Sequence, residues 1–270
     1  MTNSDKLFAG SIPELYDRFL VPLIFDWYAR DLAERLAKSQ PLDVLETATG
    51  TGALTRAIAA RLAAPVRIVA TDLNQPMLDR AAASSPLAGR VDWRQADALA
   101  LPFEDMRFDA VACQFGAMFF PDKIAGYREA RRVLKPGGQF LFNVWDRISE
   151  NDFANTVTEA LAGLFPASPP TFMARTPHGY HDVAIIRREL AEAGFATVLV
   201  ETVDGISRAA TARDVAIAYC QGTPLRNEIE ARGASRLDEA TQVAADALAR
   251  HFGNGPIEGR IRAHVITAAR

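Results

Sequence analysis

The segment Val44–Gly52 reads VLETATGTG and decides the fold of this 270-residue chain. It continues an apolar run that starts at Leu42, as is typical of a buried strand. Small residues follow, and then apolar residues recur with the spacing of one helix face at Leu54, Ile58 and Leu62. A strand that turns through small residues into a helix is the opening unit of a parallel α/β sheet.

The alternation of strand and helix continues to residue 145. Pro76 suits the first turn of one helix, Asp122 can cap another, and the tetrapeptide Lys135–Gly138 ends a helix before the next strand. Strands separated by helices form a parallel, doubly wound sheet. We therefore predict five α/β units, with strands at Leu42–Glu46, Val66–Thr71, Val91–Gln95, Phe108–Cys113 and Gln139–Trp145.

Outside this region the pattern is mostly helical. Residues 1–40 are predicted to form an N-terminal helical lid over a cleft, and residues 41–270 to form the main domain. Alanine-rich, helix-favouring stretches return towards the C-terminus. We expect cap insertions at about residues 146–180 and 204–258, and two more strands at Ala196–Val203 and Arg260–Thr267.

Composition restricts the class of partner. The formal net charge is −3, and charged residues are interspersed along the chain, so nucleic acids and anionic membranes are poor candidate partners. The two cysteines, Cys113 and Cys220, form no Cys-x-x-Cys pair, and we predict neither a disulfide framework nor a metal site. Met1–Ser11 lacks a signal-peptide pattern and no apolar run approaches a membrane span, which favours a cytoplasmic protein.

The small-residue loop predicts a binding site for an adenosine-bearing ligand. Backbone N–H groups around Gly50 and Gly52 form a hydrogen-bonding cradle at the carboxyl end of a strand. Asp72 follows twenty positions after Gly52, at the end of the second strand, where a carboxylate can accept both hydroxyls of a ribose. The alternatives are a tight turn without ligand for the loop, and helix caps or solvated loop acids for Asp72 and Asp97.

Two residues discriminate between adenosine ligands. A dinucleotide fingerprint has a third small residue where this chain has Thr55, and Glu46 would place a negative charge beside a pyrophosphate. S-adenosylmethionine carries an ammonium and a sulfonium and no phosphate, so a carboxylate at position 46 attracts it. The sequence therefore favours S-adenosylmethionine over NAD(P).

The pattern Glu46-x-Ala48-x-Gly50-x-Gly52 resembles the first motif of class I S-adenosylmethionine-dependent methyltransferases, with Ala48 in place of the usual first glycine. Within this family the chain looks like the broad small-molecule branch that includes quinone-biosynthesis methyltransferases. The resemblance implies a Rossmann-like sheet of seven strands, mostly parallel, whose last strand is antiparallel. It extends over residues 42–145 through Asp72–Asn74 with Met77, Gln95–Ala98, Leu101–Phe103, Phe108–Asp109 and Arg132–Gly138.

The resemblance also implies roles for individual residues. Glu46 and the loop residues Ala48, Thr49, Gly50 and Gly52 orient the methionine part of the cofactor, and Asp72 binds its ribose. The adenine is held by Leu73, Met77, Asp97 and the backbone of Ala98. Gln114, Phe115 and Gly116 line the passage between the donated methyl group and its acceptor.

Residues on the acceptor side are predicted from their positions. Phe115, Met118 and Phe119 follow the fourth strand and favour an apolar acceptor pocket, although a plain core is the alternative; Tyr180 is a further candidate. Tyr16 is either a lid residue that reaches the cofactor or part of an apolar helix face. His178 and His181 are candidates for a base, with surface histidines as the alternative.

The leading hypothesis is methyl transfer to a small, partly hydrophobic metabolite. The alternatives are a non-catalytic S-adenosylmethionine-binding module and an NAD(P)-binding oxidoreductase. No residue pattern defines the acceptor atom or the oligomeric state.

Overall fold

The computed structural model describes residues 8, 10–84, 87 and 89–270. Its backbone packing divides the chain into two compact units, and each is described by itself below. The sheet unit comprises Asp26–Val144, His181–Val203 and Ala263–Arg270. The helical unit comprises Met1–Phe25, Trp145–Tyr180 and Asp204–Arg262.

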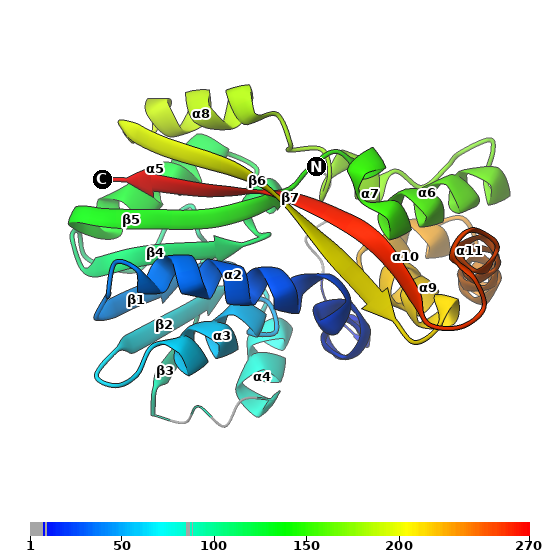
Figure 1. Cartoon of the computed structure of the whole chain (residues 1–270), viewed down its shortest axis with the longest axis horizontal. Helices are drawn as coiled ribbons and strands as arrows, with labels where there is room; N and C mark the ends of the chain where they lie inside the picture. The colour runs from blue at the N-terminus through cyan, green and yellow to red at the C-terminus, as the bar shows by residue number, and fades with distance from the viewer. Residues whose placement is uncertain (1–7, 9, 85–86, 88) are drawn as a thin grey trace. The chain divides into compact units, whose positions relative to one another are not determined.

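Seven strands form one sheet in the order β3-β2-β1-β4-β5-β7-β6. The first five pair in parallel, and the arrow of β7 points opposite to those of β4 and β6 (Figure 1). This arrangement confirms the predicted doubly wound, mostly parallel sheet with an antiparallel last strand. The strands are β1 (Asp43–Glu46), β2 (Arg67–Asp72), β3 (Val91–Gln95), β4 (Phe108–Gln114), β5 (Leu134–Trp145), β6 (Thr197–Ala209) and β7 (Ile257–Ala269).

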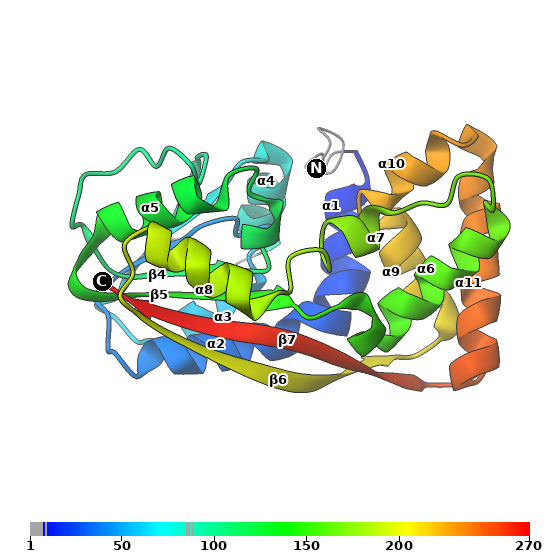
Figure 2. The same ribbon diagram turned by 90° about the horizontal axis from the view of Figure 1, so that it is seen from above.

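Helices cover both faces of the sheet. Figure 2 shows α2 (Asp26–Ala37) and α3 (Ala53–Arg61) on one face of the sheet, and α5 (Lys123–Val133) and α8 (Val183–Glu192) on the other. The helix α4 (Gln75–Ser84) connects β2 to β3. The short helix η3 (Ala117–Phe119) follows β4. Because both faces are covered, the central strands are apolar on both sides, as parallel strands require.

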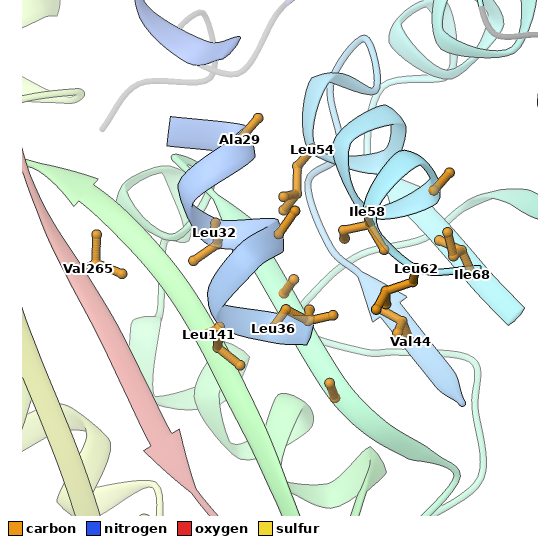
Figure 3. Close-up of a cluster of buried hydrophobic side chains, with 14 residues drawn as sticks. Ala29, Leu32, Leu36, Val44, Leu54, Ile58, Leu62, Ile68, Leu141 and Val265 are labelled. Atoms are coloured by element: carbon orange, nitrogen blue, oxygen red, sulfur yellow. The ribbon is translucent and has the colours of Figure 1, made fainter. Parts of the chain in front are cut away.

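Each face has its own apolar core. On the first, Leu32, Leu36, Leu54 and Ile58 from α2 and α3 lie against strand residues including Val44, Leu141 and Val265 (Figure 3). On the second face, the ring of Tyr127 lies 5.8 and 5.3 Å, centroid to centroid, from Phe140 and Phe142. Each buried side chain of this size stabilises the fold by about 1.5–3 kcal/mol through the hydrophobic effect. The sheet is therefore fixed on both faces.

The prediction of five α/β units is wrong at one connection. Residues 96–107, between β3 and β4, contain no helix. Arg132 of α5 holds this extended segment by donating to the carbonyl oxygens of Leu101 (2.9 Å) and Phe103 (2.7 Å). Glu129 accepts the N–H of Leu101 at 2.7 Å. Side chains of α5 thus satisfy backbone groups that a helix would satisfy internally.

The tetrapeptide Lys135–Gly138 follows the end of α5, as predicted, but it lies inside β5 as an interruption of the strand ladder. Phe108 of β4 pairs with Leu134, and the next paired residue, Ala110, faces Gln139. The Lys135 ammonium lies 2.8 Å from Asp109 Oδ1. Asp109 Oδ2 accepts the N–H groups of Leu42 and Asp43 at 2.9 and 2.8 Å. These motif residues therefore tie β1, β4 and β5 together at the edge opposite to the carboxyl ends.

The helical unit holds the remaining helices. Among described residues, no helix combines the length and apolar character needed to cross a membrane. The lid and cap roles of residues 1–40, 146–180 and 204–258 stay predictions. The elements are α1 (Ile12–Leu15), the π-helix η2 (Tyr16–Phe25), η4 (Ile148–Glu150), α6 (Asp152–Leu164), α7 (Phe172–Arg175), α9 (Ala212–Gln221), α10 (Leu225–Glu230), η5 (Ala234–Arg236) and α11 (Leu237–Phe252).

Candidate functional site

The loop between β1 and α3 is a tight turn at the carboxyl ends of three strands. Ala48, Gly50 and Gly52 all have positive φ, at 52°, 57° and 82°. The N–H of Thr47 donates to the carbonyl of Ala112 in β4, and the N–H of Thr49 donates to that of Thr71 in β2, both at 2.9 Å. The loop is therefore fixed from both neighbouring strands.

Glu46, the last residue of β1, is completely buried beneath this loop. Its Oε2 accepts the hydroxyl of Thr55 at 2.6 Å, and the hydroxyls of Thr55 and Thr49 lie 2.7 Å apart. Its other oxygen, Oε1, is buried and has no hydrogen-bond partner among the described residues. Burial raises the pKa of Glu46 to about 7, although the bonds from Thr55 and Thr49 oppose the shift. A buried carboxylate with an unused acceptor oxygen fits a cationic ligand group.

Asp72, the last residue of β2, connects two loops. Its Oδ2 accepts the N–H of Gly50 at 2.8 Å, and its Oδ1 accepts the N–H of Asn74 at 2.8 Å. Burial raises the pKa of Asp72, against the effect of these bonds. Asp72 is buried, so the alternative of a solvated loop acid is wrong for this residue. The Asn74 amide Nδ2 also donates to Oδ1, at 3.4 Å, so Oδ2 is the oxygen with acceptor capacity for ribose hydroxyls.

The loops after β2 and β3 are joined beside Asp72. The N–H of Ala96 donates to the carbonyl of Asp72 at 3.0 Å, and the Gln95 amide donates to that of Leu73 at 2.9 Å. Leu73 is 47% exposed, whereas Met77 is buried. Asp97 is exposed, and Ala98 is half-buried. The predicted adenine residues therefore gather around one junction of loops.

The turn after β4 is held by a residue that the motif analysis missed. Phe115 has a positive φ of 49°. Its N–H donates to both the backbone carbonyl (3.2 Å) and the side-chain Oδ1 (3.0 Å) of Asn143 in β5. Asn143 is completely buried, and its Nδ2 has no partner among the described residues. The available signal was its polarity, since it is the one polar residue in the run Phe140–Trp145.

Comparison with known proteins identifies the family of this region. Residues 44–138 match the family described as a methyltransferase domain. Over 119 residues the chain is 44% identical to the demethylmenaquinone methyltransferase of Deinococcus radiodurans, a match that covers 43% of this chain and 47% of that relative. The chain thus carries a methyltransferase domain. The match spans about half the length of this relative, and it confirms the predicted resemblance to quinone-biosynthesis methyltransferases.

Solved structures share the fold of the methyltransferase domain. Phosphoethanolamine N-methyltransferase 2 of Haemonchus contortus, in complex with S-adenosyl-L-methionine, matches with a TM-score of 0.61 and 17% identity, over 100% of this chain and 60% of that chain. The 4+2 cyclase SpnF matches with a TM-score of 0.55 and 21% identity, over 91% of this chain and 80% of that chain. Because a cyclase also has this fold, the fold does not define the reaction.

The residues predicted to face the acceptor lie partly in the core of the methyltransferase domain. Phe115 and Met118 are buried, and Phe119 is half-buried. The ring of Tyr28 packs edge-on against Phe115, with the ring centroids 5.4 Å apart. Gln114 is half-buried at the end of β4. These contacts also agree with the plain-core alternative for Phe115 and Met118, so their role towards an acceptor stays a prediction.

Tyr16, His178 and Tyr180 belong to the helical unit. Tyr16 stacks on Phe25, with the ring centroids 5.2 Å apart, and Tyr180 is buried. His178 is also buried, so the surface alternative is wrong for this histidine. Its Nδ1 lies 2.8 Å from the backbone carbonyl oxygen of Asp146. A carbonyl only accepts, so Nδ1 carries a proton.

The remaining candidates differ in their surroundings. His181, in the sheet unit, is half-buried. Cys113 and Cys220 are free and buried, and burial raises the pKa of each thiol to about 12. Among the described residues, no group of three or more histidine, cysteine or acidic side chains is arranged to hold a metal ion.

Proposed function

We propose that this chain catalyses methyl transfer from S-adenosylmethionine to a small, partly apolar molecule. The observation that carries the proposal is the buried, unpartnered Oε1 of Glu46 at the start of the glycine loop. An α-ammonium group supplies both the hydrogen-bond donor and the positive charge that this oxygen lacks. When bound, S-adenosylmethionine supplies an electrophilic methyl group on its sulfonium.

The chain's own residues would bind and align this cofactor. Glu46 and the loop backbone from Ala48 to Gly52 would hold the methionine part, and Asp72 would accept the ribose hydroxyls. The exposed side chain of Leu73 would cover the adenine, with Met77 beneath it and Asp97 beside it. Displacement at a methyl group depends chiefly on alignment and on exclusion of water, which fixed loops at strand ends provide.

The same site disfavours the NAD(P) alternative. Thr55 stands where a dinucleotide fingerprint has a small residue, and its hydroxyl is engaged with both Glu46 (2.6 Å) and Thr49 (2.7 Å). A pyrophosphate at this loop would face the Glu46 carboxylate in a site shielded from solvent. Like charges repel most strongly where water does not screen them.

For the acceptor we propose a molecule with an apolar ring, such as a quinone-like compound. The name of the Deinococcus radiodurans relative supports this class, and the aromatic and methionine side chains after β4 agree with it. Phe115, Met118 and Phe119 would contribute the apolar wall, and Tyr180, in the helical unit, stays a separate candidate. His178 and His181 are the candidate bases for an acceptor that loses a proton on methylation.

Calorimetric titration tests the cofactor assignment. We expect S-adenosylmethionine and S-adenosylhomocysteine to bind, and NAD to bind much more weakly. Glu46→Gln should weaken S-adenosylmethionine at least about ten-fold, the size of a lost charged hydrogen bond. Glu104→Gln, which changes an exposed glutamate, is the matched control. Tight NAD binding with no S-adenosylmethionine binding would favour the oxidoreductase.

Turnover is tested separately from binding. Purified protein is incubated with methyl-labelled S-adenosylmethionine and a panel of demethylated quinones and of small oxygen, nitrogen and carbon acceptors. Label should appear in at least one ring-containing acceptor. Tight binding without transfer to any acceptor would favour the non-catalytic binding module.

A further inference from the structure

The turn after β4 and the glycine loop meet at a point with no spare room. A Cβ added to Gly116 would lie 2.4 Å from the Cβ of Ala48 and 2.8 Å from the Sγ of Cys113. Carbon atoms of neighbouring side chains normally stay about 3.5–4.0 Å apart. A methyl group at position 116 would therefore overlap the methyl of Ala48 by more than about 1 Å.

Both segments are fixed and cannot retreat from each other at low cost. The glycine loop is held on either side of Ala48 by the bonds from Thr47 to Ala112 and from Thr49 to Thr71, both 2.9 Å. The turn after β4 is held by the two bonds from the Phe115 N–H to Asn143. A clash between positions 48 and 116 must therefore displace one of these anchored loops.

The backbone at this contact is strained on both sides. Ala48 has a φ of 52° and Phe115 a φ of 49°, a conformation that costs residues with a Cβ about 1 kcal/mol or more. Ala48 stands where the methyltransferase motif usually has glycine, which would adopt this φ without strain. Strain of this kind persists where the surrounding structure holds it, often at binding sites. The methyl of Ala48 therefore occupies space that glycine at both positions would leave empty.

We propose that the Ala48 methyl group and Gly116 form a steric interlock that positions the cofactor loop against the turn on the acceptor side. The space between the loops holds one methyl group, which belongs to position 48. Ala48 and Gly116 are positioning residues, because they set the distance between the loop that binds the methionine part and the turn that lines the methyl passage. The expected effect on cofactor binding rests on the proposed function, whereas the expected steric clash between positions 48 and 116 does not.

A double-mutant cycle tests the interlock, with the Kd of S-adenosylhomocysteine measured by calorimetry. Gly116→Ala should weaken binding at least about ten-fold because the loops are forced apart. Ala48→Gly removes the methyl that separates the loops and should weaken binding by less than Gly116→Ala does. Ala48→Gly/Gly116→Ala should recover part of the Gly116→Ala loss, because one methyl is again present while the contact with Cys113 Sγ remains. Gly163→Ala, at a helix glycine with no atom near an added Cβ, is the matched control.

A further variant separates the clash with Cys113 from the clash with Ala48. Should Cys113→Ala/Gly116→Ala recover binding while Ala48→Gly/Gly116→Ala does not, the clash lies with the thiol and the interlock is excluded. A Gly116→Ala protein with unchanged affinity overturns the proposal as well. If only the unfolding midpoint falls while the Kd of the folded variant is unchanged, the pair stabilises the fold without positioning the site.

Unfolding measurements on the ligand-free proteins distinguish a failure of the proposed function from a failure of the interlock. If the unsubstituted protein binds neither cofactor form, the proposed function fails, but the unfolding midpoints of the four proteins still measure the steric coupling. Gly116→Ala should lower the midpoint, and adding Ala48→Gly should restore part of the loss. If Gly116→Ala does not fold, recovery of folded protein by Ala48→Gly is the equivalent result, and failure to recover overturns the interlock.

Discussion

Burial gives the Glu46 carboxyl group two linked properties. It raises the pKa to about 7, and it leaves Oε1 without a partner among the described residues. Near neutral pH the free protein therefore holds this group partly protonated. A bound cation favours the ionised form, so ligand binding and proton release are coupled at this residue.

The first prediction concerns stability. Because the folded pKa of Glu46 lies above its unfolded value of 4.5, the stabilisation present below pH 4.5 is lost as the pH rises through 7. Glu46→Gln retains an acceptor for Thr55 without a titrating charge. The free energy of unfolding of Glu46→Gln minus that of the unsubstituted protein should thus be larger at pH 8 than at pH 4.5, by about 3 kcal/mol, so the variant is relatively more stable at pH 8.

Urea denaturation of the ligand-free proteins at both pH values measures this difference. Comparing two proteins at each pH cancels the titration of the other acids. An equal difference at pH 4.5 and pH 8 would show that Glu46 ionises normally in the folded state.

The second prediction concerns binding. S-adenosylmethionine should bind the ionised form of Glu46, so its affinity should rise as the pH increases up to about 7 and level off above it. The limiting slope is about ten-fold per pH unit, as for release of one proton. Calorimetry in buffers of different ionisation enthalpy counts the released proton directly. For Glu46→Gln the pH dependence over this range should be lost, and a persisting slope would assign it to another group.

At the scale of elements, the sequence predicted the strands and helices that have a regular apolar period. It did not predict an irregular segment whose conformation depends on a few side-chain hydrogen bonds. Strand and helix periods located β1 to β4 within two residues, because one buried face of each element must be apolar. The connection at residues 96–107 was mispredicted, since it depends on Arg132, which lies some 30 positions further along the chain. No local pattern encodes such a bond.

The candidate site divides in the same way. Glu46, Asp72 and the loop glycines follow from a motif, because their positions at strand ends are fixed by the fold. Asn143 could not be assigned from the motif, since its partner Phe115 lies in another strand's turn. That Oε1 of Glu46 has no hydrogen-bond partner could be learned only from the structure, because a sequence does not define which hydrogen bonds form.

The third prediction concerns the hydrogen bonds from Arg132 of α5 to the extended connection at residues 96–107. Arg132→Ala leaves the Glu129 carboxylate and the carbonyls of Leu101 and Phe103 without their shared donor. The free energy of unfolding should fall by about 2–3 kcal/mol, the scale of lost charged hydrogen bonds. Arg132→Lys should recover less than half of it, because an ammonium cannot reproduce the planar fork.

Arg128→Ala, at an exposed position of the same helix, is the control and should cost under about 0.5 kcal/mol. Chemical denaturation at pH 7 compares the three variants. Full recovery by lysine would show that charge alone, and not the geometry of the guanidinium, holds the connection.

At the scale of the whole molecule, the proposed cofactor residues other than Tyr16 fall within the sheet unit, and the residues from β1 to the end of α5 match the methyltransferase family. A ligand that binds only the folded state stabilises it by about 2.7 kcal/mol at one hundred times its Kd. We therefore predict that S-adenosylhomocysteine raises the unfolding midpoint of the unsubstituted protein. The rise should be much smaller for Glu46→Gln at the same ligand concentration.

Hydrogen exchange places this stabilisation along the chain. Amide groups of the loop after β1, of Leu73 and Asn74 and of the turn after β4 should exchange more slowly with ligand, because these backbone groups surround the proposed site. The exchange rates of the amides that form ladder bonds at the amino ends of β1 and β4, beside Asp109, should change least with ligand. This holds for amides that exchange without global unfolding. Protection confined to the helical unit, with no change at Gly50 and Gly52, would contradict the assignment of the cofactor to the glycine loop.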